Sequence, residues 1–419
     1  MTAADKSLNI LLLVDCLDDP ADPDSFFKLK YSFIREQVTA VSSLHRIFFP
    51  LLIPYLPAAL KKIYSFRGMA LHFPRERNGI LEGIDFRTLR YWYLPRYYPR
   101  TKYSALKRFL AQQSERYDLI HCHTVYDLGL AGLKLKEKSG LPLVVTIYGT
   151  DLNWLFEEGG RSASSEIAKA TKKILKGADA VIAVSRDLGK KVNKLGVEEK
   201  RIHWVPNGID KELFFPGDKI RERIGLGLNE NDKIILYVGN LIETKGLGDL
   251  IKALEIIQTG DDPLPKFKLL LVGPGTGYKK TMEQMISECG LEERVVFLGP
   301  RPHEDIPALM RAADVFCLPS WREGWPCSVV EAMACGVPVV ATEVGGIPEL
   351  VNDKEAGILC PAKEPAGLAR ALQKALTRKW DSNRICAAAE PYTYDKLALK
   401  IDGIYRQVLK TNIENKHPD

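Results

Sequence analysis

The sequence predicts an α/β protein with two doubly wound parallel sheets, and three observations predict it. Short apolar runs rich in Val and Ile recur along the 419 residues, amphipathic segments separate them, and this alternation runs through the chain twice. Runs of about five apolar residues suit strands that are buried on both faces of a parallel sheet. Two such series of strands and helices therefore predict two Rossmann-like domains.

The first series lies in the first half of the chain. Its apolar runs predict strands at Ile10–Val14, Leu119–His121, Leu143–Ile147, Ala180–Val184 and His203–Val205. Between the strands Leu143–Ile147 and Ala180–Val184, Ser164–Lys176 has the spacing of an amphipathic helix. We expect this half to form one domain.

The second series repeats the pattern. Its runs predict strands at Ile234–Val238, Lys268–Val272, Val295–Leu298, Val315–Leu318 and Val337–Ala341, with helices at Lys245–Gln258, Lys279–Cys289, Cys327–Ala334 and Tyr394–Leu409. Turn-forming Pro, Asn, Gly and Asp residues near Asn207–Asp218 predict the join between the series. We predict domains at residues 1–208 and 209–393, and a C-terminal helix in residues 394–419 that returns to the first domain.

Composition excludes several classes of protein. Apolar residues make up 46% and charged residues 27%, which is typical of a folded chain. The net charge of +6 does not indicate a nucleic-acid-binding protein. Eight cysteines without a C-x-x-C pair argue against a disulfide scaffold or a zinc ribbon. With no apolar run of about 18 residues and no signal-peptide pattern, we expect a cytoplasmic protein with buried thiols.

One region departs from this pattern. Residues 28–108 hold 16 Lys or Arg residues and four acidic residues, a net charge of +12. They also hold the charge-free run Ile47–Leu60 and an aromatic cluster, Tyr91, Trp92, Tyr93, Tyr97 and Tyr98. Together these features favour contact with an anionic membrane surface. A solvated basic surface is the plainer alternative, and no motif for binding nucleic acid accompanies the charge.

The sharpest functional signal is the segment Ser320–Glu331, with the sequence SWREGWPCSVVE. It follows the strand Val315–Leu318 and enters a helix near Cys327, so it lies at the carboxyl end of a strand, where open α/β sheets bind ligands. Free N–H groups at a helix start suit a diphosphate. The carboxylates of Glu323 and Glu331 suit the paired hydroxyls of a sugar or a ribose.

This segment, continued by AMACGVPVVA at 332–341, resembles the E-x7-E signature of retaining GT-B glycosyltransferases, specifically glycosyltransferase family 4. The resemblance covers nearly the whole chain. It includes, in order, DLIHCH from Asp118, YGTD from Tyr148, ADAVIAVS from Ala178, VPNGID from Val205, VGN from Val238, Lys245-Gly246, VGPG from Val272, VGGIPE from Val344 and GILCP from Gly357. It implies two Rossmann-like domains facing each other across a cleft, with the acceptor in the first and the nucleotide-sugar in the second.

The resemblance also implies roles for single residues. Glu323, Lys245 and Asp151 would form the catalytic set, with Glu323 on the donor sugar and Lys245 on the leaving diphosphate. Glu331 would accept hydrogen bonds from the ribose. The other expected donor contacts are Asn240, Gly324, Trp325, Pro326, Ser328, Val329, Gly345 and Gly346. Asn240 stands where family members usually have Arg.

The acceptor is expected at His121, His123, Asp127 and Tyr148. His121 and His123 lie two positions apart on a strand end, so they share one face of the sheet. Tyr148 stands where many family members have a His beside the sugar. The sequence supplies no further metal ligands next to the His pair, so we expect neither a metal nor another cofactor beside the nucleotide-sugar co-substrate.

The resulting hypothesis is a metal-independent, retaining hexosyltransferase. It would move a sugar from a nucleotide diphosphate, UDP by preference, to a glycan or lipid-linked acceptor in surface polysaccharide or glycolipid synthesis. It would act at the cytoplasmic face of the membrane. The alternatives are a nucleotide-sugar epimerase or a phosphorylase on the same fold, and a non-catalytic protein that binds a nucleotide-sugar or a glycan. The sequence leaves the base, the sugar, the acceptor, the linkage and the oligomeric state open.

Overall fold

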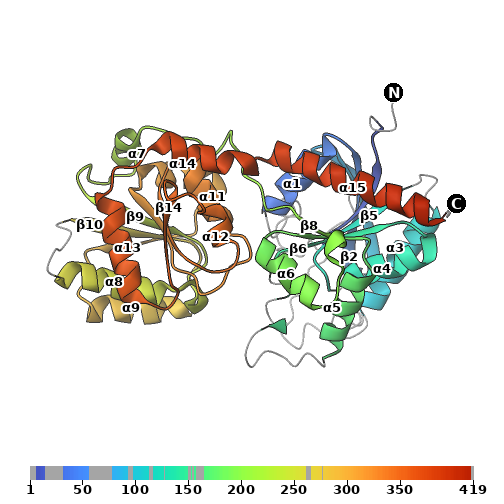
Figure 1. Ribbon diagram of the computed structural model, residues 1–419, viewed down its shortest axis with the longest axis horizontal. Coiled ribbons are helices and arrows are strands. Elements are labelled where there is room, and N and C mark those ends of the chain that lie inside the picture. Colours follow the sequence, from blue (N-terminus) through green and yellow to red (C-terminus); the bar gives the residue numbers. More distant parts are fainter. Residues whose placement is uncertain are drawn as a thin grey trace. The chain divides into compact units, whose positions relative to one another are not determined.

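The computed structural model describes residues 6–14, 32–55, 78–92, 98–112, 117–126, 128–149, 152, 155–156, 165–260, 266–275 and 277–416. The chain divides into two compact units, residues 1–207 with 394–419, and residues 208–393. Each unit is built around one sheet with helices packed on it (Figure 1). The roles that we assign to the units, acceptor binding and donor binding, stay predictions.

The sheet of the first unit has, among the described residues, eight strands in the order β3-β4-β2-β1-β5-β6-β7-β8. These are β1 (Asn9–Val14), β2 (Arg46–Tyr55), β3 (Asn78–Leu81), β4 (Ile84–Trp92), β5 (Leu119–His123), β6 (Leu143–Ile147), β7 (Ala180–Ala183) and β8 (Ile202–Trp204). β3 is antiparallel to β4, and the other neighbouring strands are parallel. The strand order reverses between β1 and β5. Sheets of this kind bind ligands at the carboxyl ends of the two strands where the order reverses.

The C-terminal helix packs on this first unit. Figure 1 shows α15 (Tyr394–Lys416) beside α1 (Ser32–Ser42). The α15 side chains Leu397, Ile401 and Tyr405 are buried in the same core as residues of β1 and α1. The other helices of the unit are α3 (Tyr98–Gln112), α4 (Leu128–Ser139), α5 (Glu166–Gly177), α6 (Arg186–Lys194) and the 3-10 turn η4 (Glu199–Arg201).

The sheet of the second unit is parallel throughout and has, within the described residues, the strand order β11-β10-β9-β12-β13-β14. Its strands are β9 (Lys233–Val238), β10 (Phe267–Val272), β11 (Val295–Gly299), β12 (Val315–Leu318), β13 (Val339–Thr342) and β14 (Gly357–Cys360). The order reverses between β9 and β12. The carboxyl ends of these two strands therefore form the edge of the sheet at which a ligand is expected.

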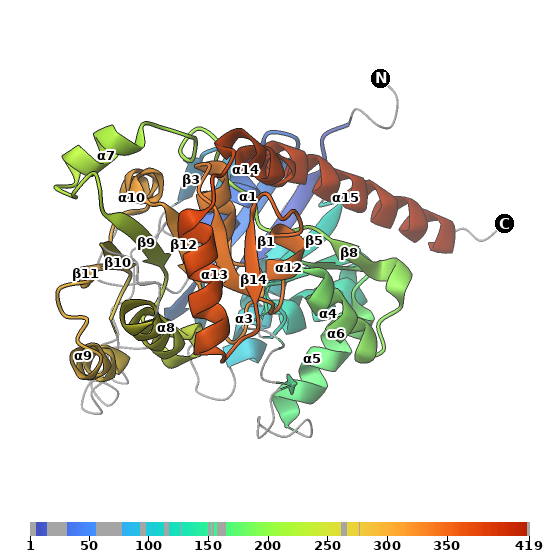
Figure 2. The ribbon, with the colours of Figure 1, turned by 60° about the vertical axis from the view of Figure 1, so that its left-hand side comes forward.

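Helices cover this second sheet in two groups. α8 packs against α9 and α13, whereas α11 packs against α10 and α14. Figure 2 shows α13 lying over the strands β12 and β14. The helices are α7 (Lys219–Gly225), α8 (Leu247–Thr259), α9 (Tyr278–Glu288), α10 (Ile306–Ala312), α11 (Cys327–Ala334), α12 (Ile347–Leu350), α13 (Pro365–Thr377) and α14 (Ser382–Ala389), with 3-10 turns η5 (Glu243–Lys245), η6 (His303–Asp305) and η7 (Glu390–Tyr392).

The ten strands predicted from the apolar runs are confirmed, but β2, β3, β4 and β14 were not predicted as strands. The prediction that the charge-free run Ile47–Leu60 takes part in membrane contact is wrong for the part whose side chains the structure describes. Ile47, Phe48, Phe49 and Leu51 are buried in β2, which lies between β1 and β4. This part of the run belongs to the core and offers nothing to a membrane. Residues 56–60 lie outside the described residues.

Two more members of the basic aromatic stretch are also buried. Tyr91 and Lys102 are each 2% exposed, and the Lys102 ammonium lies 5.5 Å from the centre of the Tyr91 ring. Trp92 is 47% exposed, whereas Tyr93 and Tyr97 lie outside the described residues, as does the side chain of Tyr98. In the described residues, no helix is long and apolar enough to cross a membrane.

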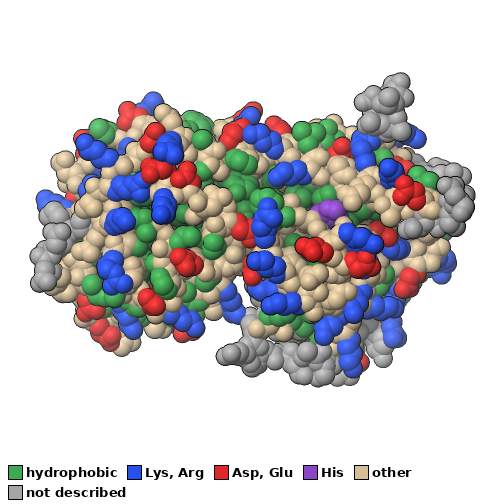
Figure 3. All heavy atoms as spheres, in the orientation of Figure 1, with side chains coloured by type: hydrophobic (Ala, Val, Ile, Leu, Met, Phe, Trp, Pro, Cys, Tyr) green, Lys and Arg blue, Asp and Glu red, His purple; other side chains and the backbone are tan. Residues whose placement is uncertain are grey.

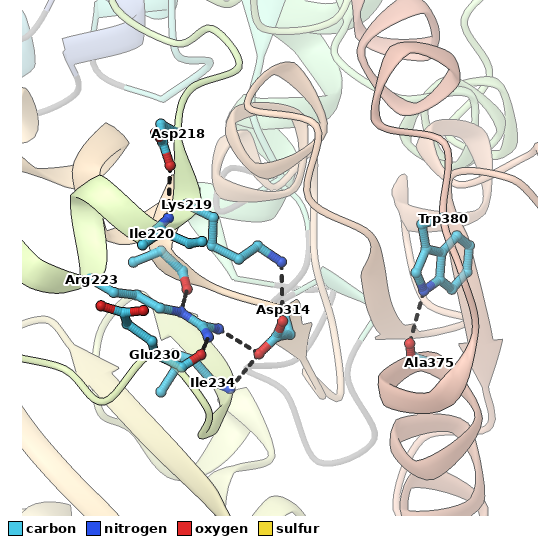
Figure 4. A network of polar contacts seen from close by, with 10 residues as sticks. Asp218, Lys219, Ile220, Arg223, Glu230, Ile234, Asp314, Ala375 and Trp380 are labelled. Carbon is cyan, nitrogen blue, oxygen red and sulfur yellow. Dashed lines mark hydrogen bonds and ion pairs between the residues drawn. The ribbon is translucent and has the colours of Figure 1, made fainter.

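A buried arginine joins α7 to the sheet of the second unit (Figure 4). Arg223 is 4% exposed and donates hydrogen bonds to the carbonyls of Ala312 and Glu230. Its third contact is with the carboxylate of Asp314, at 2.6 Å. A charge that far from water is stable only because each part of the guanidinium has an acceptor.

Asp314 is the other centre of this network (Figure 4). It also accepts hydrogen bonds from the Lys219 ammonium at 3.0 Å and from the Ile234 amide at 2.8 Å. Burial alone would raise the pKa of Asp314, but Lys219, the Ile234 amide and Arg223 together lower this pKa below its ordinary value. The carboxylate therefore stabilises the fold above about pH 4, and this contribution is lost as the pH falls through the lowered pKa.

Replacing Arg223 by Met tests this network. The change leaves Asp314 with one cation fewer and two carbonyls without their donor, so we expect the free energy of unfolding to fall by about 3 kcal/mol at pH 7. Urea unfolding followed by tryptophan fluorescence measures it. The difference from wild type should shrink as the pH falls below about 4, because Asp314 becomes protonated. Arg221→Met, at an exposed position of the same helix, is the matched control. Equal stability of the two variants would contradict the account.

Candidate functional site

Loops at the carboxyl ends of three neighbouring strands bring the predicted donor residues together. Asn240 and Lys245 follow β9, Glu323 lies between β12 and α11, and Gly345 and Gly346 follow β13. β9, β12 and β13 are adjacent in the sheet, and the strand order reverses between the first two. The site therefore lies where the topology of an open parallel sheet leads us to expect a ligand.

A lysine, a serine and a glutamate form the centre of the site. The Lys245 ammonium lies 2.6 Å from Oε1 of Glu323, and the Ser320 hydroxyl donates to the same oxygen, also at 2.6 Å. The Glu323 side chain is 9% exposed and Ser320 is fully buried. Charge-assisted hydrogen bonds in such surroundings are strong, so the two donors fix the orientation of the carboxylate.

Glycine allows the loop after β13 to touch the Glu323 loop. Gly345 has φ +55°, and a Cβ atom there would lie 1.9 Å from the Glu323 carbonyl oxygen. The amide of Gly346 donates to the carbonyl of Gly324 at 3.1 Å. Gly346 is one of the donor contacts expected from the sequence, but its amide is used to join the two loops.

The loop that carries Lys245 packs against the segment 319–321, which precedes Glu323. Gly246 has φ +68°, and a Cβ atom there would lie 1.9 Å from the carbonyl oxygen of Pro319. The amide of Trp321 donates to the carbonyl of Thr244 at 2.9 Å. The backbones on which Lys245 and Glu323 stand are therefore in direct contact, which sets the distance between the two charges.

The start of α11 lies next to this pair. Pro326 is its N-cap residue and makes no side-chain capping bond, and the amide of Val329 donates to the Pro326 carbonyl at 3.1 Å. Ser328 lies in the first turn, where the helix dipole favours an anion. Trp325 is 5% exposed and packs edge-on against Tyr392, so its side chain belongs to the core.

Glu331, the second carboxylate of the motif, has a partner that the sequence does not predict. It lies in α11 and is 8% exposed. Nε2 of His303, in η6 after β11, lies 3.1 Å from Oε1 of Glu331. His303 is 28 positions away along the chain, so no spacing points to it. Ser320, in contrast, stands three positions before Glu323, and that spacing could have indicated the contact.

In the first unit, His121 and His123 lie at the end of β5 with their ring centres 4.3 Å apart. Their predicted common face is confirmed. His121 is hydrogen-bonded to the Tyr405 hydroxyl through Nδ1 and to the Thr146 hydroxyl through Nε2, at 2.7 Å each. Both ring nitrogens are thus used inside the unit, which leaves His121 no nitrogen for the acceptor that the sequence assigns to it.

His123 is hydrogen-bonded to the hydroxyl of Tyr148. Burial lowers the pKa of His123 to about 3. Burial, followed by the neighbouring His123, also lowers the pKa of His121 well below its usual range. Both rings are therefore neutral at pH 7 and act as hydrogen-bonding groups. Asp127 and Asp151 lie outside the described residues.

The part of the chain that the structure describes holds no group of three His, Cys, Asp or Glu side chains that could bind a metal ion. Four of the described cysteines, Cys122, Cys317, Cys335 and Cys360, are buried. Burial raises the pKa of Cys335 to about 12 and that of Cys360 to about 11, so these thiols are not nucleophiles at neutral pH.

Two known protein families match the two halves of the chain. Residues 218–391 match the family of glycosyl transferases group 1, and residues 40–213 match Glycosyltransferase Family 4. N-acetyl-alpha-D-glucosaminyl L-malate synthase of Bacillus anthracis is 28% identical over 371 residues, covering 85% of this chain and 94% of that protein. A D-inositol 3-phosphate glycosyltransferase of Acidothermus cellulolyticus is 30% identical over 308 residues, covering 70% of this chain and 68% of that protein.

Solved structures show the same fold. Sucrose-phosphate synthase from Thermosynechococcus elongatus has a TM-score of 0.72 at 23% identity, covering 96% of this chain and 100% of that one. Anabaena HepE in complex with UDP-glucose has a TM-score of 0.64 at 23% identity, covering 96% of this chain and 99% of that one. The predicted α/β fold of two Rossmann-like domains is confirmed. The chain belongs to glycosyltransferase family 4 and is a GT-B glycosyltransferase.

Proposed function

We propose that the protein transfers a sugar from a UDP-sugar to an acceptor hydroxyl, with retention of the anomeric configuration and without a metal ion. The observation that carries this proposal is the Lys245–Glu323 pair at the carboxyl ends of β9 and β12. A fixed cation and a fixed carboxylate at one edge of a parallel sheet match what a sugar diphosphate needs. The cation stabilises the charge that develops on the leaving diphosphate, and the carboxylate holds sugar hydroxyls.

Each group in the second unit has a distinct part in this proposal. Lys245 and the first turn of α11 bind the diphosphate, with Ser328 in that turn. Oε1 of Glu323 is held by Lys245 and Ser320, so Oε2 is the oxygen that we assign to the donor sugar. Glu331 accepts from the ribose. Asn240, Gly324 and the backbone of 325–328 and 345 complete the proposed donor site, whereas the amides of Val329 and Gly346 are used in hydrogen bonds within the unit.

Two proteins of similar structure support a nucleotide diphosphate donor. Anabaena HepE is in complex with UDP and with UDP-glucose, and starch synthase IV of Arabidopsis thaliana is bound to ADP and acarbose. We therefore keep UDP as the first choice and ADP as the second.

For the acceptor we propose a small hydroxylated anion in the first unit. The names of the curated relatives support this choice, since one makes an N-acetyl-glucosaminyl L-malate and the others are D-inositol 3-phosphate glycosyltransferases. Tyr148, held by His123, and Asp127 are the residues that we propose for the acceptor hydroxyl, and Asp151 stays in the proposed catalytic set. These side chains would bind the hydroxyl and not the anionic group of the acceptor. An alcohol hydroxyl needs such acceptors and donors to be oriented toward the reacting carbon.

The test begins with thermal unfolding in the presence of UDP-, GDP-, ADP- and TDP-sugars, because a ligand that binds the native state raises its melting temperature. Release of nucleoside diphosphate is then measured with and without malate or inositol phosphate. We expect release to depend on the acceptor. Conversion of the sugar without release would identify an epimerase, and binding without any turnover would identify a non-catalytic protein. Proton NMR of the product decides between retention and inversion.

Glu323→Gln keeps the size of the side chain and removes its charge. We expect the turnover number to fall by about 10²–10³-fold. The melting temperature should fall as well, because Lys245 loses its counter-ion in a buried pair, so activity is compared at a temperature at which both proteins are folded. Glu293→Gln, at an exposed position of the same unit, is the matched control and should keep full activity. Equal turnover of Glu323→Gln and wild type with every donor would contradict the proposed role.

A lipid-linked acceptor at the cytoplasmic face of a membrane is the second candidate, in surface glycan or glycolipid synthesis. The antiparallel strands β3 and β4 favour it, because Ile80 is 77% exposed and Trp92 is 47% exposed on them. Arg87 and Arg90 lie on the same strand as Trp92. On the face drawn in Figure 3, however, Lys and Arg side chains are interspersed with Asp and Glu.

Co-sedimentation with vesicles of phosphatidylglycerol and phosphatidylcholine at low salt tests this second candidate. If the β3–β4 segment inserts, Ile80→Asp should lower the bound fraction several-fold, since a charge at the membrane interface opposes insertion. Ile224→Asp, which changes a residue that is 63% exposed in the second unit, should leave the bound fraction unchanged. A wild-type protein that stays in the supernatant would rule out this surface as a membrane contact.

A further inference from the structure

We propose that His303 is a positioning residue for Glu331, and that it gives the nucleotide site its selectivity for ribose over 2′-deoxyribose. The inference rests on the proposed function, because it needs a nucleoside diphosphate to bind beside Glu331. It concerns a residue that neither the E-x7-E signature nor any spacing in the sequence indicates. The hydrogen bond between His303 and Glu331 carries it.

His303 is held on two sides. Nε2 lies 3.1 Å from Oε1 of Glu331, and the centre of its ring lies 5.1 Å from that of Phe214 with the planes tilted by 52°. Phe214 is 2% exposed, so its ring is packed in the core and restricts the position of the His303 ring. Since a carboxylate only accepts hydrogen bonds, Nε2 carries the proton and donates it.

The contact restricts how the Glu331 carboxylate can turn. The side chain is 10% exposed, and a carboxylate that is removed from water to this degree needs a donor. His303 supplies one to Oε1. This hydrogen bond engages Oε1, and we assign Oε2 to the ligand. A glutamate without this contact has a terminal torsion with broad freedom.

A fixed carboxylate can recognise the vicinal hydroxyls of a ribose. Each hydroxyl donates one hydrogen bond, and the 2′-deoxy sugar lacks one of the two donors. A site that is built to bond a hydroxyl rejects the analogue without it, because its own polar group then stays unpaired. If the carboxylate turns freely, water satisfies it and this rejection weakens. The selectivity therefore depends on the group that holds Glu331 in place.

Two variants separate positioning from bulk. His303→Ala removes the donor, whereas His303→Gln keeps an N–H group at a similar distance from the backbone. Glu304→Ala, at an exposed position of the same turn η6, is the control. Isothermal titration measures the dissociation constants of UDP and of 2′-deoxy-UDP for each protein, and thermal unfolding without ligand checks that each variant is folded.

We expect His303→Ala to weaken the binding of UDP about tenfold and to leave that of 2′-deoxy-UDP nearly unchanged, so the ratio of the two constants falls. His303→Gln should keep most of the wild-type ratio. An equal loss for both ligands would show a merely structural role and overturn the proposal. Tighter binding of UDP by His303→Ala would also overturn it, because His303 would then be a competitor of the ribose for Glu331.

The proposed function has a separate point of failure. If wild-type protein binds neither UDP nor the diphosphates of guanosine, adenosine and thymidine, the donor site itself is wrong and the role of His303 falls with it. If wild type binds UDP but the ratio is the same in wild type and His303→Ala, only the role of His303 is overturned.

Discussion

The ion pair between Lys245 and Glu323 is the interaction on which the donor site depends. It exists because the strand order of the second sheet reverses between β9 and β12, so the loops that follow these strands lie side by side. Two glycines then let three backbone segments touch, since any side chain at Gly246 or Gly345 would collide with a neighbouring carbonyl. The positions of the charges are thus set by backbone contacts before any ligand binds, as electrostatic preorganisation requires.

Most residues of this site could be predicted from the sequence because they lie close together along the chain, in one motif. Glu323 and Glu331 are eight positions apart on one loop and helix, and the predicted bounds of β12 and α11 match the structure. The pairing of Lys245 with Glu323 joins loops 78 residues apart, and that of His303 with Glu331 spans 28. Distances of this kind follow from the strand order, which no local pattern reveals.

The strand β2 shows why part of the fold was missed. Pro50 and Pro54 argue against a central strand, since proline cannot donate to a sheet. The pairing of β2 with β1 covers 46–48, so both prolines lie beyond it, in the part of β2 that pairs with β4. Residues 47–51 are all buried, so this part of the run has no alternation of apolar and polar residues either. Lys102 is another case, because its charge predicts exposure while its side chain lies buried over Tyr91.

The central claim is that the donor binds in the second unit, at the carboxyl ends of β9 and β12. A crystal structure of the protein with UDP tests it most directly. The account predicts the diphosphate within hydrogen-bonding distance of the Lys245 ammonium and the first turn of α11, and the ribose hydroxyls on Glu331. UDP bound elsewhere, for instance in the cavity of about 760 Å³ between the loop 226–232 and β11, with Lys245 still paired to Glu323, would contradict it.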